Sequence, residues 1–145
     1  MSVGRHCSRV VATASPAENI RTAAQRMADH EVGTLVVVEG GGHAVGVLTD
    51  RDIALRCIAG RFDSSETPIS ELMSTPAHGV DEHTPVEDAV TRMADLGVRR
   101  LIVTGEDNRV VGILSLDDVL ELIIEQTGAV GRLLKQQKPG ILARI

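Results

Sequence analysis

The sequence predicts an α/β (α+β) fold built from two similar halves, each a small sheet packed against two helices, with a pseudo-two-fold axis between them. Three observations support this prediction. A single shift of the sequence against itself superimposes its two halves, each half contains an amphipathic helix followed by two short β-branched runs, and 145 residues suffice to bury a shared core. With one Phe, no Trp and no Tyr, that core is expected to consist of Val, Leu, Ile, Ala and Met.

The repeat has a period of 66 residues and needs no gap. Self-similarity at a fixed period indicates two copies of one supersecondary unit. It is clearest between residues 23–58 and 89–124. The identical pairs include Ala23/Ala89, Arg26/Arg92, Met27/Met93, Ala28/Ala94, Asp29/Asp95, Val32/Val98, Leu35/Leu101, Val37/Val103, Val45/Val111, Gly46/Gly112, Leu48/Leu114 and Asp52/Asp118.

Each half begins with a predicted amphipathic helix. Apolar residues recur at i, i+3, i+4, i+7 and i+8 within 20–28, and the same spacing returns within 86–94. The segments 15–18 (Ser-Pro-Ala-Glu) and 84–87 (Thr-Pro-Val-Glu) are typical of capping boxes with Pro at the first helical position. Because these boxes lie 69 rather than 66 residues apart, the first helix is expected to begin about one turn earlier.

Two strands and a second helix follow in each half. Continuous β-branched runs are typical of strands that are covered on both faces, and Gly, Asn and Asp between them indicate hairpin turns. The polar connector 60–68 is too short for independent halves, so they are expected to pack face to face. The predicted elements are strands 35–38 and 101–103, turns 40–43 and 106–109, return strands 45–48 and 111–114, and helices at about 50–58 and 116–125.

Each return strand ends in the motif Gly-apolar-apolar-(Thr/Ser)-x-x-Asp. One copy runs from Gly46 to Asp52 and the other from Gly112 to Asp118. Two copies between a predicted strand and helix resemble the nucleotide-site motif of the CBS-domain family, named from cystathionine β-synthase. The resemblance covers about residues 3–127 and identifies the chain as a stand-alone tandem CBS-domain pair, or Bateman module. It implies a disc-like unit whose inter-domain clefts take AMP, ADP, ATP or related adenosyl ligands.

The motif also has a physical rationale. A hydroxyl at a strand-to-helix junction lies beside free backbone N–H groups, where the helix dipole favours an anion such as phosphate. An Asp one turn later can accept hydrogen bonds from ribose hydroxyls. The alternative is plain helix capping without a ligand, because Thr49-x-x-Asp52 and Ser115-x-x-Asp118 are also capping patterns. The duplicated framework favours a ligand role for at least one copy.

The resemblance further implies that each cleft uses residues from both halves. Val and Ile can form an apolar slot for adenine without aromatic residues. The expected sets are Ile113, Ser115 and Asp118 with Val32, Gly33 and backbone near Ala12 and Thr13 for one cleft, and Val47, Thr49 and Asp52 with Val98 and residues 78–80 for the other.

Arginines distinguish the two halves. Arg99 and Arg100 precede a predicted buried strand, and the resemblance places these positions near ligand phosphates, for which a guanidinium suits bidentate contact. The alternative is a solvated pair at a strand edge. The matching positions of the first half are Gly33 and Thr34, so the two clefts are expected to be unequal, with the arginines serving the Asp118 cleft. Arg51 is expected either to reach phosphate or to form an ion pair.

Composition argues against several other functions. The net charge of −5 without a basic cluster, and the lack of aromatic stacking platforms, argue against nucleic acid. No apolar run approaches a membrane span, and the first nine residues do not look like a signal peptide, so a cytoplasmic location is expected. Cys7 and Cys57 are expected to be small apolar residues rather than a disulfide or metal site. Residues 78–83 hold the nearest approach to a metal cluster, without the spacing of a known site.

The sequence therefore predicts a regulatory module that has no catalytic residues or catalytic cofactor, binds an adenine nucleotide and signals to an unknown regulated protein. The alternative is a ligand-independent interaction module that regulates a separate enzyme or transporter by docking. The expected boundaries are 3–62 for the first CBS domain and 69–127 for the second. Residues 128–145 are expected to form a short helix or frayed tail, ordered in part by a homodimer contact.

Overall fold

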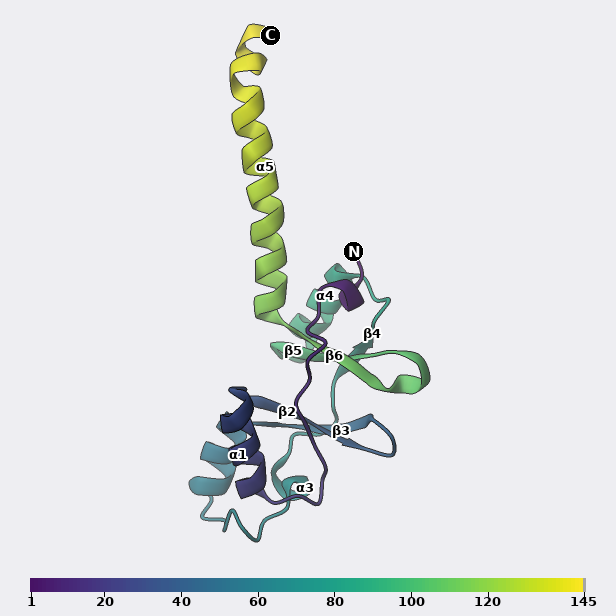
Figure 1. Cartoon of the computed structure of the whole chain (residues 1–145), viewed down its shortest axis with the longest axis vertical. Helices are drawn as coiled ribbons and strands as arrows, with labels where there is room; N and C mark the ends of the chain where they lie inside the picture. Colours follow the sequence, from purple (N-terminus) through teal and green to yellow (C-terminus); the bar gives the residue numbers. More distant parts are fainter. Residues whose placement is uncertain (145) are drawn as a thin grey trace.

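The predicted α/β (α+β) architecture is confirmed: two halves, each containing a three-stranded sheet and helices, stack on one another (Figure 1). The computed structural model describes the backbone of residues 1–144 and the side chains of residues 1–136. In both sheets a short edge strand runs parallel to the central strand, which pairs with an antiparallel return strand. The strands are β1 (Thr13–Ala14), β2 (Thr34–Glu39) and β3 (His43–Thr49) in the first sheet, and β4 (Gly79–Asp81), β5 (Arg100–Thr104) and β6 (Val110–Ser115) in the second.

Helices cover the outer face of each sheet. In the first half these helices are α1 and α2, and α2 continues directly into the π-helical segment η2. In the second half they are α4 and the start of α5. The helices are η1 (Val3–Arg5), α1 (Ile20–His30), α2 (Asp50–Asp52), η2 (Ile53–Ile58), α3 (Ile69–Leu72), α4 (Val86–Leu96), η3 (Glu106–Asn108) and α5 (Leu116–Arg144).

Each half has its own aliphatic core between helix and sheet. In the first half Ile20 and Met27 of α1 pack against Leu35 and Val37 of β2, and Cys57 is buried in the same cluster as a free thiol. Corresponding residues of α4 and β5 form the second core. Because alternate residues of a strand face opposite sides, the residues between these core positions point toward the other half.

The two first helices begin in register, and the predicted offset between them is wrong. Helix α1 begins at Ile20, capped by Asn19, whose side chain accepts the Thr22 N–H at 2.8 Å, and α4 begins at Val86, 66 residues later. Glu18 does accept the Ser15 N–H, as in a capping box, but the segment 15–18 remains a turn. Its carbonyls are used elsewhere, because Ile69 N–H donates to Glu18 O and Ser70 N–H to Pro16 O.

The segment that precedes each half in the sequence packs on the other half. Val3, which is fully buried, belongs to the core of the second half, where its N–H donates to Thr84 O at 2.8 Å. Ile69, also fully buried, belongs to the core of the first half. The chain then crosses to the other sheet in both cases, so the two halves are interleaved rather than consecutive.

This interleaving explains the glycine of each motif. A Cβ at Gly112 would stand 2.7 Å from Cys7 Sγ and 2.8 Å from Ser8 O, and a Cβ at Gly46 would stand 2.6 Å from Met73 Sδ. Real Cβ contacts are not that short, so the crossing segment can approach the return strand only where no side chain intervenes. The motif glycines therefore serve packing between the halves.

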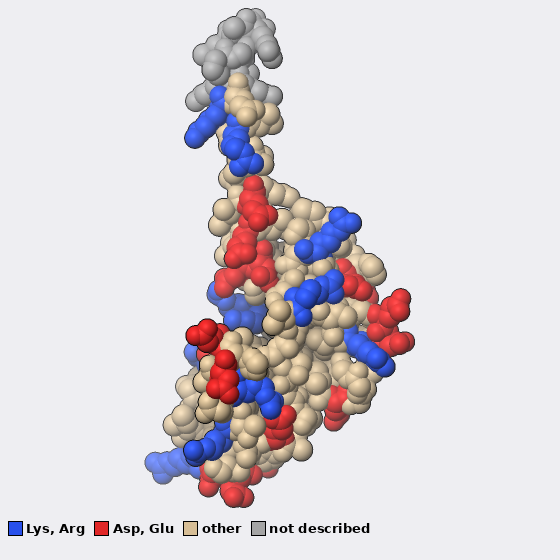
Figure 2. Space-filling view, in the orientation of Figure 1, with Lys and Arg blue, Asp and Glu red and all other residues tan. Residues whose placement is uncertain are grey.

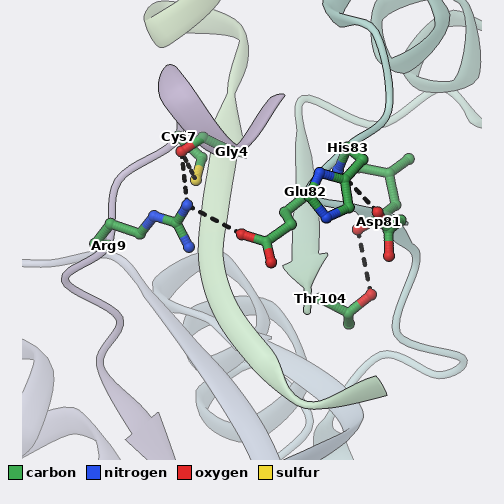
Figure 3. A network of polar contacts seen from close by, with 8 residues as sticks. Gly4, Cys7, Arg9, Asp81, Glu82, His83 and Thr104 are labelled. Carbon is green, nitrogen blue, oxygen red and sulfur yellow. Dashed lines mark hydrogen bonds and ion pairs between the residues drawn. The ribbon is translucent and has the colours of Figure 1, made fainter. Parts of the chain in front are cut away.

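Arg9 fixes the N-terminal segment on the second half (Figure 3). Its Nη2 donates to Gly4 O at 2.7 Å and forms an ion pair with Glu82 Oε2 at 3.2 Å. Cys7 lies beside Gly4, and burial raises the pKa of its thiol, which keeps it neutral. The free, half-buried thiol acts here as a small apolar group.

The last helix differs from the prediction. Instead of a break near residue 128, α5 continues from Leu116 to Arg144 and projects away from both halves (Figure 1). Val119 is buried in the second core and Leu122 packs against it. The amide of Gln126 still contacts Met1 Sδ at 3.2 Å, and the described side chains that follow, up to residue 136, are exposed or only partly buried.

Candidate functional site

Two clefts open where the inner faces of the sheets meet. Val36 of β2 and Ile102 of β5 are 1% and 2% exposed, yet belong to neither outer core, because they fill the space between the halves. One cleft lies on either side of this contact, and Thr34, Arg100 and Ile113 line both. We call them the Thr49 cleft and the Gly33 cleft after one residue unique to each.

The Thr49 cleft has a volume of about 400 Å³. It joins the end of β3 to the segment before β4 and to the loop between α4 and β5. Its lining combines aliphatic residues with three arginines. The lining consists of Thr34, Val47, Thr49, Arg51, Ser74, Pro76, His78, Gly97, Val98, Arg99, Arg100, Ile102 and Ile113.

The Gly33 cleft is the counterpart of the Thr49 cleft under the 66-residue repeat, and is smaller, at about 250 Å³. Apolar side chains make up most of its surface, and Arg100 is its one cationic residue among those described. The lining consists of Ser8, Val10, Val11, Ala12, Val32, Gly33, Thr34, Val36, Arg100 and Ile113.

Strand register positions the polar side chains at the clefts. Arg100 pairs with Ser115 across β5 and β6, and Thr34 pairs with Thr49 across β2 and β3. Since side chains alternate along a strand, Arg100 and Ile102 share the inner face while Leu101 enters the core. The backbone before β5 is also fixed, because Leu116 N–H donates to Arg99 O at 2.8 Å.

Positive charge is concentrated in the Thr49 cleft. Arg51, Arg99 and Arg100 line it together, and no Asp or Glu does. Among the described residues, none of these three guanidinium groups forms an ion pair or hydrogen bond. The prediction assigned both arginines to the Asp118 cleft, which corresponds to the Gly33 cleft; Arg100 does line the Gly33 cleft, but it also lines the Thr49 cleft, and Arg99 lines the Thr49 cleft alone. The loop before β5 faces the end of β3 across the interface, so Arg99 lies near Thr49, and Arg100 lies between the clefts.

The acidic residue of each motif forms a helix cap. Asp52 Oδ2 accepts the Thr49 N–H at 2.9 Å while Thr49 Oγ1 accepts the Asp52 N–H at 3.1 Å, and Ser115 and Asp118 repeat both bonds at the same distances. Asp52 Oδ1 also lies 3.6 Å from Arg56 Nε. Asp52, Ser115 and Asp118 line neither cleft. These are the helix-capping bonds that the sequence offered as the alternative to a ligand role, and they use only one of the two oxygens of each carboxylate.

Most of the other predicted cleft residues lie where they were expected. Val47, Thr49 and Val98 meet in the Thr49 cleft together with His78, while residues 79–80 face a separate groove. Val32, Gly33, Ala12 and Ile113 meet in the Gly33 cleft, and Thr13 lines a neighbouring groove.

Sequence reasoning missed the contribution of the crossing segments. Ser8 and Ser74 line equivalent positions of the two clefts, because each pairs with the motif strand of the other sheet, at Ile113 and Val47 respectively. Both are serines separated by 66 residues. Extending the repeat comparison upstream of residue 23 would have found them.

Asp81 and Glu82, the acidic residues of segment 78–83, form bonds with other groups of the protein. Figure 3 shows Glu82 directed toward Arg9, and Asp81 Oδ1 accepts the His83 N–H at 2.8 Å. Within the described part of the chain, no three His, Cys, Asp or Glu side chains come together as metal ligands. Nor does any described helix combine the length and apolar character that crossing a membrane requires.

A family model of the CBS domain matches the chain twice, at residues 3–58 and 69–125. Among curated proteins, CBS domain-containing protein YhcV of Bacillus subtilis is 45% identical over 109 residues, which is 75% of this chain and 76% of YhcV. Protein MK0525 of Methanopyrus kandleri is 31% identical over 122 residues, or 84% of this chain, and this segment spans only 62% of MK0525.

Solved structures of similar fold include two with bound ligands. The CBS domain pair of protein MJ0100, in complex with 5-methylthioadenosine and S-adenosyl-L-methionine, superimposes with a TM-score of 0.77 at 26% identity, covering 87% of this chain and 98% of the other. CBS domain protein PAE2072 from Pyrobaculum aerophilum, complexed with AMP, gives a TM-score of 0.72 at 26% identity, covering 86% and 99%.

Proposed function

The chain belongs to the CBS-domain family, as a tandem pair of CBS domains, and from this premise we propose that it is a regulatory module that binds an adenine nucleotide in its inter-domain clefts. Ligand occupancy would be signalled to a separate regulated protein. The proposal includes a cytoplasmic location, association of two copies, and no catalysis by the chain itself. AMP, ADP, ATP and related adenosyl compounds are the candidate ligands.

The observation that carries the proposal is the cluster of arginines in the Thr49 cleft. Arg51, Arg99 and Arg100 repel one another across a cleft that contains no carboxylate, and an anion with several oxygens relieves that repulsion. Thr49 supplies a hydroxyl on the same rim, ahead of α2. Phosphate of a nucleotide fits this chemistry, and the AMP complex of PAE2072 supports it by similarity.

The apolar wall of the same cleft suits adenine. Val47, Val98, Ile102 and Ile113 contribute aliphatic surface to its lining. The Gly33 cleft has the aliphatic wall but one arginine, so we propose that it takes a less charged adenosyl compound. The MJ0100 complex supports the ligand class by similarity, because neither of its two adenosyl ligands carries phosphate. Ser115 and Asp118 remain proposed ribose or phosphate contacts through atoms that the cap leaves available. For Asp52 the same role requires release of Oδ1 from Arg56, whose Nε lies 3.6 Å away.

A calorimetric screen tests the proposal. Protein freed of carried-over ligand by unfolding and refolding is expected to bind AMP, ADP or ATP with micromolar to millimolar dissociation constants, and adenosine more weakly. S-adenosylmethionine and NAD complete the panel, and the same samples are assayed for hydrolysis of each ligand. Absence of heat and of thermal stabilisation with all of them would contradict nucleotide binding and favour the ligand-independent docking module. Turnover abolished by a cleft substitution would contradict the non-catalytic assignment.

Asp118→Ala separates the cap from the ligand contact. Loss of the Ser115 N–H bond to Asp118 Oδ2 is expected to lower the free energy of unfolding by about 1 kcal/mol, measured by urea denaturation. If the second carboxylate oxygen contacts ligand, calorimetry will also show weaker binding, whereas a pure cap leaves affinity unchanged. Asp118→Asn is the control, since its amide oxygen can still accept the Ser115 N–H. A variant that melts earlier but binds normally removes Asp118 from the proposed site.

A further inference from the structure

The distal part of α5 is a helix without support from its own chain. Beyond Gln126, no described side chain of α5 forms a hydrogen bond or ion pair with the two halves, and Figure 1 shows the helix continuing into open space. Most helical stability in proteins comes from packing of an apolar face, and Gly128 and Gly131 each cost roughly 1 kcal/mol relative to Ala. A Cβ at Gly131 would meet no atom within 4 Å, so nothing in this chain requires the glycine.

One face of this helix carries an apolar seam. Leu116, Leu120, Ile123, Thr127, Val130 and Leu134 follow one another at alternating intervals of four and three residues, which is the spacing of a helix that pairs with another helix. From Leu120 onward these side chains are exposed, with Val130 and Leu134 each more than half exposed. Gly131 borders the seam, where a missing side chain allows close approach.

Charge is distributed unevenly along α5. Its first turns carry Asp117, Asp118, Glu121 and Glu125, whereas Arg132 and Lys135 follow further along. Figure 2 shows the acidic side chains on the lower part of this helix and the basic ones above them. Two parallel copies would place acid beside acid and base beside base. Two antiparallel copies place the acidic part of each beside the basic part of the other.

We propose that the distal part of α5 pairs with the α5 of a second copy of this chain in an antiparallel orientation. Antiparallel alignment about a centre close to Gly128 brings Ile123 opposite Leu134 and Thr127 opposite Val130, so that the exposed seam is covered by its own counterpart. This interface is independent of the nucleotide clefts. It gives the projecting helix the partner that its length and glycines require.

Cysteine cross-linking of the full chain tests the orientation. Ile123→Cys combined with Leu134→Cys is expected to give an intermolecular disulfide under mild oxidation, and each single variant is not. Residues 123 and 134 of one helix lie about 16 Å apart, too far for an internal bond. Wild-type protein measures the background from Cys7 and Cys57. If Leu134→Cys alone forms disulfide-linked dimers as readily as the double variant, the helices pair in parallel. If none of the variants forms more cross-linked dimer than the wild-type protein, the helices do not pair. Either result overturns the proposal.

A second measurement uses two adjacent leucines. Leu133 and Leu134 are 51% and 55% exposed, but only Leu134 lies on the seam. Sedimentation is expected to show that Leu134→Asp raises the dimer dissociation constant at least about 10-fold, because it places a carboxylate in the apolar contact, whereas Leu133→Asp changes it little. Equal effects of the two substitutions would contradict the seam.

Discussion

Replacing Arg99 and Arg100 together by Gln is expected to weaken AMP binding about 100-fold or more. Each guanidinium lines the Thr49 cleft, and neither forms a hydrogen bond or ion pair with the side chains and backbone that the structure describes. Loss of one charge-assisted hydrogen bond costs about 1.5–3 kcal/mol, which is roughly ten- to a hundred-fold in the dissociation constant. Because both arginines are exposed on the cleft rim, the free energy of unfolding should change little. Calorimetry with AMP measures the affinity.

Two controls make this result specific. Arg109→Gln removes an exposed arginine from the hairpin turn after β5, outside both clefts, and is expected to leave AMP affinity unchanged. Adenosine, which has no phosphate, is expected to bind the wild-type protein and the double variant alike. Unchanged AMP affinity in the double variant would remove the arginines from the site, and an equal loss for adenosine would show that the substitution had damaged the cleft itself.

Ile69→Ala is expected to lower the free energy of unfolding by about 2–5 kcal/mol. Its side chain is fully buried in the first core, and truncation of a buried Ile costs its transfer free energy and leaves a cavity. This is a large fraction of the stability of a typical domain, which is about 5–15 kcal/mol. Ile58→Ala is the matched control, because Ile58 is 72% exposed and its truncation should cost little. Urea denaturation measures both.

The same variant tests the interleaving of the halves. In the sequence Ile69 opens the second half, but it packs with Ile20 and Leu35 of the first. Hydrogen exchange is therefore expected to show that Ile69→Ala lowers the protection of α1 and β2 more than that of α4 and β5. The reverse pattern would contradict the crossed packing, as would a free energy of unfolding within about 0.5 kcal/mol of wild type.

Local patterns predicted the elements well. The apolar runs at 35–38 and 101–103 became the buried parts of β2 and β5, and the i, i+3, i+4 spacing became the inner faces of α1 and α4. Both signals depend on neighbours in the sequence, which is why they could be found without a structure.

The errors about the first helix, the arginines and the motif glycines depend on distant partners. The box at 15–18 looks like a helix start, but its carbonyls bind amides of residues 69 and 70, which no local pattern reveals. Strand alternation predicts that Arg100 faces inward, yet which cleft it serves depends on how one sheet sits on the other. The role of Gly112 was similarly hidden, since it makes room for Cys7 and Ser8 about 100 residues earlier in the chain.

The crossed packing also sets an order of events while the chain is being synthesised. The first core lacks only Ile69 and its neighbours, so it can close once residues near 73 have emerged. Val3 has to wait for Thr84, 81 residues further on, and Ser8 has to wait for Ile113, 105 residues further on, which takes roughly 5–20 s at ribosomal speed. The residues made first are therefore among the last to dock, and Val3 and Cys7 stay available to chaperones throughout that delay.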